Sequence, residues 1–187
     1  MDMQVLYMTE EEREEIISYG TKRCKVIFVS TLVVLTLSWI LGIIWQGIIF
    51  WLCLSVLRRY AGGYHADTEK RCYVISFVMI LISLLCIKFI HFDKYWELFI
   101  IQTINFFIIF LMAPIENKNH ILDFDEKSRY GDLTKSIELS LYFVYIFLNL
   151  VDRYKEASSI GMANILVAVS ILLGYAKNYR ILEIKKY

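Results

Sequence analysis

Cysteine, histidine and proline are scarce in this chain of 187 residues, and it carries almost no net charge. The four cysteines show no CxxC spacing, and two of them, Cys53 and Cys86, lie inside apolar runs. This spacing argues against a disulfide framework or a zinc site, so we expect mostly reduced thiols. With 20 basic and 19 acidic residues, the net charge of +1 gives no global field that would attract a nucleic acid.

The start of the chain also lacks the basic and then apolar pattern of a signal peptide. It reads MDMQVLYMTEEEREE and is acidic, so we expect no cleavable signal. Apolar residues are abundant instead: they make up 58% of the chain and give a mean hydropathy of +0.52. They cluster in runs and do not alternate with polar residues, which predicts a single-domain, all-α integral membrane protein.

The N-terminal residues 1–25 are predicted to contain a short amphipathic helix, which lies on the membrane surface or packs under the bundle. Thr9 and Glu12 make a capping box, in which a hydroxyl and a carboxylate bind free amides of the first turn. Acidic residues open the helix at 9–25, and basic residues close it, an order that suits the helix dipole.

A run without charged residues covers positions 26–57. One straight helix of this length would reach about 48 Å, far beyond the roughly 30 Å of the hydrocarbon core. We therefore divide it near Gly42 to Gly47 into two short spans. The six expected spans are 26–41, 44–57, 73–90, 96–113, 137–151 and 160–175. The prediction is thus a bundle of about six transmembrane helices over residues 26–175, followed by a cytoplasmic tail at 176–187.

The basic residues decide between five spans and six. With six spans and the N-terminus inside, the basic residues lie on the inner side except for Lys88, Lys94, Arg153 and Lys155. With five spans they divide much more evenly between the two sides. Cytoplasmic segments are enriched in lysine and arginine, so the pattern favours six spans with both termini in the cytoplasm.

The polar segment 58–72, RRYAGGYHADTEKRC, lies between two long apolar stretches and contains the residues that point to chemistry. Cys72 and His65 supply a thiol and an imidazole, the two groups that a cysteine peptidase needs. Lys70 and Arg71 adjoin Cys72, and positive charge favours the thiolate, which is the nucleophile. The alternatives are that Cys72 is a small apolar residue and that His65 only forms hydrogen bonds in a loop.

The spacing of these two residues requires a break in the backbone. On one continuous helix, residues seven positions apart share a face but lie about 10 Å apart along the axis, so their side chains could not touch. Two glycines precede His65 and permit a break, and Asp67 or Thr68 can cap a new helix that runs through Cys72. We expect His65 to lie in a loop that folds back over the start of that helix.

Four further residues of the segment have both a functional and a plain interpretation. The amides of Gly62 and Gly63 could hold an oxyanion, or the pair could form only a turn. Arg58 and Arg59 could grip a carboxylate or carbonyl of a substrate, or they could anchor the second span on the inner side.

These residues resemble the accessory gene regulator B (AgrB) family, which are quorum-sensing membrane endopeptidases of Gram-positive bacteria. The resemblance rests on an arginine at the end of a span, the GG-x-H motif at 62–65, and a cysteine seven residues after the histidine. The chain length, the apolar layout and the A-P-x-E-N-K loop at 113–118 extend the resemblance over most of the chain. It implies a multi-pass protein of the cell membrane, and the distribution of basic residues predicts that His65 and Cys72 face the cytoplasm.

The resemblance also implies the activity, which is cleavage of an AgrD-like propeptide on its C-terminal side. Cys72 would attack the scissile carbonyl and form an acyl-enzyme thioester, with His65 as the base. A cysteine or serine of the propeptide would then displace the enzyme and give a cyclic thiolactone or lactone peptide. Arg58 and Gly63 match the supporting arginine and glycine of the family. The family analogy also favours a homodimer, and we expect no metal and no cofactor.

Two interpretations of other classes compete with the peptidase. One is a small membrane transporter or export component, whose histidine and arginines bind an anion or a peptide without a covalent intermediate. The other is a structural or regulatory subunit, in which segment 58–72 is only a basic cytoplasmic loop. Loss of propeptide cleavage in Cys72→Ser and His65→Ala variants that still insert into the membrane would favour the peptidase over both.

Overall fold

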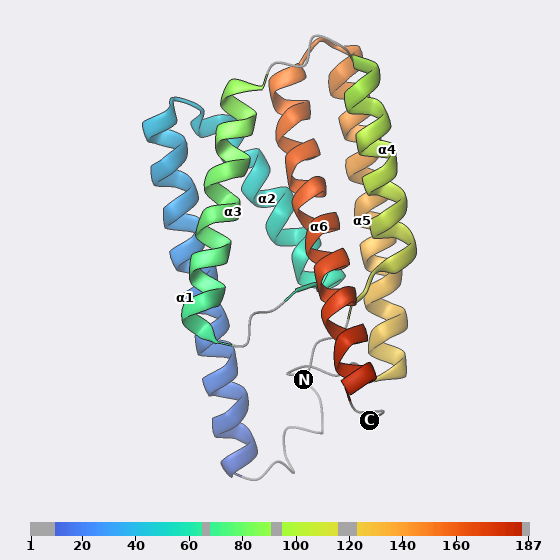
Figure 1. The fold of residues 1–187 in the computed structure, drawn as a ribbon. Helices are drawn as coiled ribbons and strands as arrows, with labels where there is room; N and C mark the ends of the chain where they lie inside the picture. The colour runs from blue at the N-terminus through green and yellow to red at the C-terminus, as the bar shows by residue number, and fades with distance from the viewer. Residues whose placement is uncertain (1–9, 65–67, 91–94, 116–122, 185–187) are drawn as a thin grey trace.

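The computed structural model describes residues 10–64, 68–90, 95–115 and 123–184, and this part of the chain is built from six α-helices (Figure 1). In chain order they are α1 (Glu10–Leu41), α2 (Ile44–Ala61), α3 (Glu69–Phe89), α4 (Tyr95–Met112), α5 (Phe124–Leu150) and α6 (Tyr154–Ile184). Within these ranges there is no β-strand, and Gly62 and Ile115 form an isolated β-bridge. The predicted all-α fold is confirmed.

Successive helices run in opposite directions, so the connections lie alternately at the two ends of the bundle (Figure 1). The turns from α1 to α2 and from α5 to α6 lie at one end, which we call the turn end. The chain passes from α2 to α3 and from α4 to α5 at the opposite end, which we call the loop end. The start of α1 and the end of α6 lie at the loop end as well.

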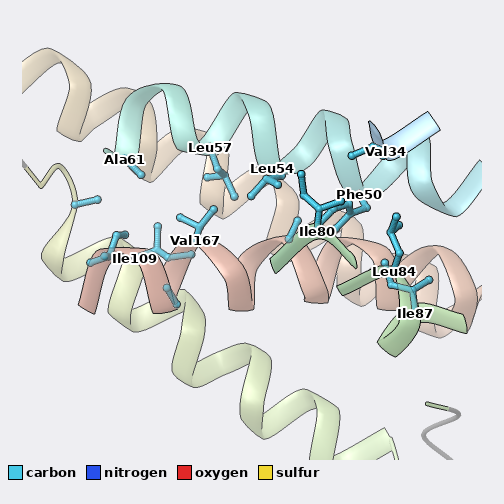
Figure 2. Packing of buried hydrophobic residues seen from close by; sticks show 14 residues of the cluster. Val34, Phe50, Leu54, Leu57, Ala61, Ile80, Leu84, Ile87, Ile109 and Val167 are labelled. Atoms are coloured by element: carbon cyan, nitrogen blue, oxygen red, sulfur yellow. The ribbon is translucent and has the colours of Figure 1, made fainter. Parts of the chain in front are cut away.

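Helices α2 and α6 form the centre of the bundle. Helix α6 contacts α2, α3, α4 and α5, whereas α2 contacts α1, α5 and α6. Buried apolar side chains form a row along one face of α2, with Phe50, Leu54 and Leu57 at helical spacing. They belong to one continuous core with side chains of the neighbouring helices, such as Val167 of α6 and Leu84 of α3 (Figure 2).

The outer surface of the bundle is rich in large apolar side chains, as expected for a protein that contacts lipid. Trp39 and Leu111 are each 75% exposed, and Leu150 is 78% exposed. Among the described residues, four helices contain segments long and apolar enough to cross a membrane, and α4 has a shorter apolar segment. The four segments are Cys24–Leu41, Lys70–Phe89, Asp125–Leu150 and Tyr154–Tyr179. The prediction of an integral membrane protein with about six helices is therefore confirmed.

The structure corrects the predicted helix boundaries. The expected amphipathic helix at 9–25 and the first span at 26–41 form one continuous helix, α1. No proline interrupts this segment, and glutamate, lysine and arginine are good helix formers, so the change in polarity does not end the helix. For the same reason α5 starts before the expected span at 137–151, and α6 continues through most of the expected tail at 176–187. Thr9 of the expected capping box lies outside the described residues.

The predicted break near Gly42 is confirmed, and its geometry shows why a glycine is suited to it. Gly42 adopts a left-handed conformation with a φ of +72°. Its N–H donates to the carbonyl of Trp39 at 3.0 Å, and the N–H of Ile43 donates to the carbonyl of Ser38 at 2.9 Å. This pair of hydrogen bonds is the Schellman motif, which satisfies the free carbonyls at the end of α1.

Candidate functional site

Segment 58–72 joins α2 to α3 at the loop end, and the structure describes it except for residues 65–67. Gly62 and Gly63 follow the end of α2 with φ of +70° and +122°. Glycine adopts such values at little cost, whereas other residues are strained by them. Helix α3 begins only at Glu69, so the expected break between positions 65 and 72 is confirmed.

Thr68 caps the new helix. Its backbone is extended, with φ −128° and ψ 145°, and its hydroxyl oxygen accepts a hydrogen bond from the N–H of Arg71 at 3.4 Å. A threonine at this position satisfies one of the free amides of the first helical turn. Of the two caps that the sequence suggests, the structure therefore assigns Thr68, and Asp67 lies outside the described residues.

Cys72 lies in the first turn of α3, where its N–H donates to the carbonyl of Thr68 at 3.0 Å. Its side chain is half-buried, close to the start of the apolar segment Lys70–Phe89. The N-terminus of a helix carries a partial positive charge, which favours a thiolate over a thiol. Lys70 and Arg71 are exposed and add positive charge next to Cys72 in the chain. A role of Cys72 as the nucleophile stays a prediction.

Arg58, in the last turn of α2, is bound within the protein through both terminal nitrogens of its guanidinium. Nη2 donates to the carbonyl oxygen of Tyr64 at 2.8 Å, and Nη1 donates to the hydroxyl of Ser170 in α6. The guanidinium also interacts electrostatically with Cys72. Arg58 therefore connects the end of α2, the backbone just before His65, and α6. A grip on the substrate stays a prediction.

The neighbouring Arg59 has a different setting. It is exposed, and its guanidinium carbon lies 5.7 Å from the centre of the Tyr60 ring, as in a cation–π contact. A charged side chain at the surface of the loop end suits a residue that anchors a span at the membrane boundary. Arg58 is thus hydrogen-bonded within the protein, whereas Arg59, its neighbour in the sequence, is exposed.

Gly62 and Gly63 lie against two other parts of the chain. Ile115, which follows α4, donates its N–H to the carbonyl of Ala61 at 3.0 Å and forms the β-bridge with Gly62. A Cβ on Gly62 would collide with the carbonyl oxygen of Ile115, and a Cβ on Gly63 would lie 2.5 Å from the hydroxyl oxygen of Ser170. Close backbone packing therefore requires both glycines. A role of their amides as an oxyanion hole stays a prediction.

His65 lies outside the described residues, so its contact with Cys72 stays a prediction. The preceding residue, Tyr64, is held against α6. Its N–H donates to the carbonyl oxygen of Ser170 at 2.8 Å and also lies 3.1 Å from the hydroxyl oxygen of the same residue. The Nζ of Lys177, about two turns further along α6, lies 5.2 Å from the centre of the Tyr64 ring. The chain is thus fixed on α6 up to the residue before the predicted base.

Sequence reasoning missed the residues of α6 that hold this segment. Ser170 is 106 positions from Tyr64 and 112 positions from Arg58, so no local pattern connects them. The signal that could have found them is a pair of small residues, Ser170 and Gly174, one helical turn apart in the otherwise apolar stretch 165–175. Residues at this spacing share a helix face and allow another backbone to approach it closely.

A second group of polar side chains is buried among α4, α5 and α6. Nδ2 of Asn164 donates to Oε1 of Glu138 at 2.9 Å, and both side chains are fully buried. Gln102 and Asn105 are buried three residues apart on α4, and Gln102 lies next to Gly161 of α6. Polar contacts of this kind hold helices together inside a membrane. We therefore assign the hydrogen bond between Asn164 and Glu138 to the stability of the bundle.

Known sequences match this chain over most of its length. The profile of the family described as Accessory gene regulator B matches residues 3–173. AgrB-like protein 2 of Clostridium perfringens (strain 13 / Type A) is 28% identical over 176 residues, which cover 89% of this chain and 79% of that protein. An AgrB-like protein of Clostridium perfringens (strain SM101 / Type A) is 27% identical over 173 residues, with the same two shares of 89% and 79%. No solved structure matches the chain.

Proposed function

Because the chain belongs to the accessory gene regulator B family, we propose that it is a membrane cysteine endopeptidase of a quorum-sensing system. Family membership supports, broadly, a role in processing a quorum-sensing propeptide. In this proposal the substrate is an AgrD-like propeptide, which is cleaved on its C-terminal side and closed into a cyclic thiolactone or lactone. Cys72 is the nucleophile and His65 is the general base.

The first half of the reaction transfers the propeptide to the enzyme. His65 accepts the proton of the Cys72 thiol, and the thiolate attacks the scissile carbonyl carbon. The C–N bond breaks, His65 returns the proton to the leaving amine, and the acyl group remains on Cys72 as a thioester. The start of α3 and the charge of Arg58 both provide positive charge that acts on the sulfur with which the reaction begins.

The second half closes the ring. A thiol or hydroxyl of the propeptide gives its proton to His65 and attacks the thioester carbonyl, and the Cys72 sulfur leaves and regains a proton. When the attacking group is a thiol, one thioester is exchanged for another at nearly balanced free energy. Hydrolysis would waste the intermediate, so the site must restrict water. The half-buried position of Cys72 at the start of an apolar segment supports this requirement.

One observation carries the proposal: Cys72 lies in the first turn of a capped helix, within electrostatic reach of Arg58. Cys24 and Cys53 lie well inside α1 and α2, and Cys86 lies in the last turn of α3, where the partial charge is negative. A cysteine in the interior of a helix lacks the partial charge of the free amides, which acts only over the first turn. Cys72 is therefore the residue best suited to act as the nucleophile.

We also propose that the loop end faces the cytoplasm. Segment 58–72 lies at the same end of the bundle as the start of α1 and the end of α6 (Figure 1). Most basic residues of the chain belong to the segments expected at this end, and basic residues are enriched on the cytoplasmic side of membranes. The propeptide would then reach Cys72 from the inner leaflet.

Propeptide cleavage in reconstituted vesicles tests the proposed activity. The probe is the peptide from a short reading frame beside the gene, with an amphipathic start, a central cysteine or serine and an acidic tail. We expect Cys72→Ala to lower the release of the C-terminal fragment by about 1,000-fold or more, because the nucleophile is lost. His65→Ala should lower it by about 100-fold or more, because the base is lost.

Cys24→Ala is the matched control, since it removes an exposed thiol from the interior of α1 and should leave cleavage unchanged. Retained cleavage by a Cys72→Ala protein that inserts normally would exclude the cysteine peptidase. Movement of the intact peptide across the vesicle membrane, without any cleavage by the unmodified protein, would support the transporter instead.

A further inference from the structure

We propose that Ser170 and Gly174 of α6 position Arg58 and the backbone of residues 62–64 for the reaction at Cys72. Helix α6 would thus support the reaction without contributing a reacting group. This inference rests on the proposed function, which names Cys72 as the nucleophile. Ser170 and Gly174 are positioning residues in this view, because they act through Arg58 and the segment that leads to His65.

Ser170 is a buried hydrogen-bonding centre for this segment. Its side chain is 7% exposed, and its hydroxyl oxygen accepts hydrogen bonds from Nη1 of Arg58 and from the N–H of Tyr64. The carbonyl oxygen of Ser170 accepts from the same N–H at 2.8 Å. Arg58 completes the arrangement by donating from Nη2 to the Tyr64 carbonyl. One residue of α6 therefore orients both the guanidinium and the adjoining backbone.

Other serines of α6 use their hydroxyls differently. Ser158 donates to the carbonyl of Tyr154 at 2.8 Å, and Ser159 donates to the carbonyl of Lys155 at 3.0 Å. Both bonds run to the carbonyl of the residue four positions earlier, which is a common hydrogen bond of a serine hydroxyl within a helix. The hydroxyl of Ser170 instead accepts hydrogen bonds from a segment outside α6. This hydroxyl therefore connects α6 to Arg58 of α2 and to Tyr64.

Gly174 lies one turn beyond Ser170 and meets the same segment. A Cβ at Gly174 would lie 2.9 Å from the carbonyl carbon of Gly63 and 3.0 Å from the nitrogen of Tyr64. Both are backbone atoms, so a side chain at position 174 could be accommodated only by moving the segment. The small residue at Gly174 and the hydroxyl at Ser170 together form the surface on which residues 63 and 64 lie.

This surface can influence the chemistry in two ways. A guanidinium that is held in place keeps its electrostatic interaction with Cys72, whereas an arginine that has lost the Ser170 hydroxyl can turn away. In addition, Tyr64 immediately precedes His65, and consecutive Cα atoms are only about 3.8 Å apart. Displacements of about 1 Å in a catalytic arrangement can lower rates about 100-fold. A change on α6 should therefore slow the reaction while all reacting groups remain present.

The test applies two measurements to Ser170→Ala and Gly174→Ala. The first is kcat for cleavage of the propeptide described above, which we expect to fall about 10-fold or more while KM stays within about 2-fold. The second is the alkylation rate of Cys72 by iodoacetamide at neutral pH, in protein whose other three cysteines are replaced by alanine. We expect alkylation to slow about 3-fold or more, because the thiolate is the reactive form.

Ser159→Ala is the matched control, because it also removes a buried serine hydroxyl from α6, and it should change neither measurement. Unchanged kcat, or unchanged alkylation, in the Ser170 and Gly174 variants would overturn the inference. An equal loss in the Ser159 control would also overturn it, since the effect would then be a general loosening of α6. If Ser170→Ala does not fold, Gly174→Ala decides alone.

Alkylation does not require cleavage, and this separates the two proposals. If Cys72→Ala still cleaves the propeptide, the proposed function fails, and the alkylation rates still decide whether α6 positions Arg58. If cleavage depends on Cys72 but the α6 variants behave like the unmodified protein, the proposed function stands and this inference fails.

Discussion

The two ends of the bundle reverse the chain in different ways. At the turn end, each described turn closes with hydrogen bonds of its own backbone. Between α5 and α6, Asp152 takes the left-handed position with a φ of +60°, and its N–H donates to the carbonyl of Asn149 at 3.4 Å. The N–H of Arg153 donates to the carbonyl of Leu148 at 2.8 Å, which repeats the pattern at Gly42. These turns depend only on neighbouring residues.

At the loop end, the chain between α2 and α3 is held by distant elements. Ala61 is bound by Ile115, which follows α4, and Tyr64 is bound by Ser170 of α6. A change at the turn end should therefore affect one turn and the stability of the bundle. A change at the loop end should alter the relation of several elements around Cys72. The difference indicates that the loop end is organised around a specific arrangement of residues.

The largest difference in cleavage is expected between variants of two adjacent arginines at the loop end. Arg58→Gln removes the charge and leaves the Tyr64 carbonyl and the Ser170 hydroxyl without their charged donor, so cleavage should fall about 100-fold or more. Arg59→Gln changes an exposed side chain and should alter cleavage by less than about 3-fold. Cleavage rates at equal amounts of inserted protein measure both, and equal losses would contradict the separation of the two arginines.

A second comparison uses one glycine from each end. Gly63→Ala adds strain at a φ of +122° and a collision with Ser170, so we expect cleavage to fall about 30-fold. A Cβ at Gly42 meets no atom within 4 Å, so Gly42→Ala adds only left-handed strain, about 1 kcal/mol of unfolding free energy. Cleavage by the Gly42 variant should stay within about 2-fold. Thermal unfolding and cleavage assays measure the pair, and a larger cleavage loss at Gly42 would reverse the comparison.

A third test concerns Thr68, which caps α3 through a hydrogen bond to a neighbouring residue at the loop end. Thr68→Ala removes the cap of α3 and should cost about 1 kcal/mol of stability, with cleavage lowered less than about 5-fold. Thr68→Ser keeps the hydroxyl and should retain both. A loss of cleavage as large as that of Arg58→Gln would show that the cap, and not the contacts with α6, organises the loop end.

Features with a local cause could be predicted from the sequence. Apolar runs locate the helices, a break is predicted near Gly42 to Gly47, and Asp67 or Thr68 is predicted to cap α3. The helix lengths could not be predicted in this way. The length of an apolar run corresponds to the thickness of the hydrocarbon core, and a helix can continue beyond that run. Charged residues with good helix propensity extend α1, α5 and α6 beyond their apolar parts.

The same distinction applies to the candidate site. Cys72, Arg58 and Gly63 stand out because their residue types and spacing are unusual at the boundary of an apolar run. Ser170 and Gly174 do not stand out, because small residues in a membrane helix usually serve helix packing. Their role becomes visible only when α6 is placed against residues 62–64.

The account depends most directly on the covalent bond between Cys72 and the propeptide. The protein can be incubated in vesicles with that propeptide, quenched in acid, digested and analysed by mass spectrometry. We predict that the N-terminal part of the propeptide is attached to Cys72 and that Cys72→Ala protein carries no such adduct. An adduct on Cys24, Cys53 or Cys86, with Cys72 unmodified, would contradict the account.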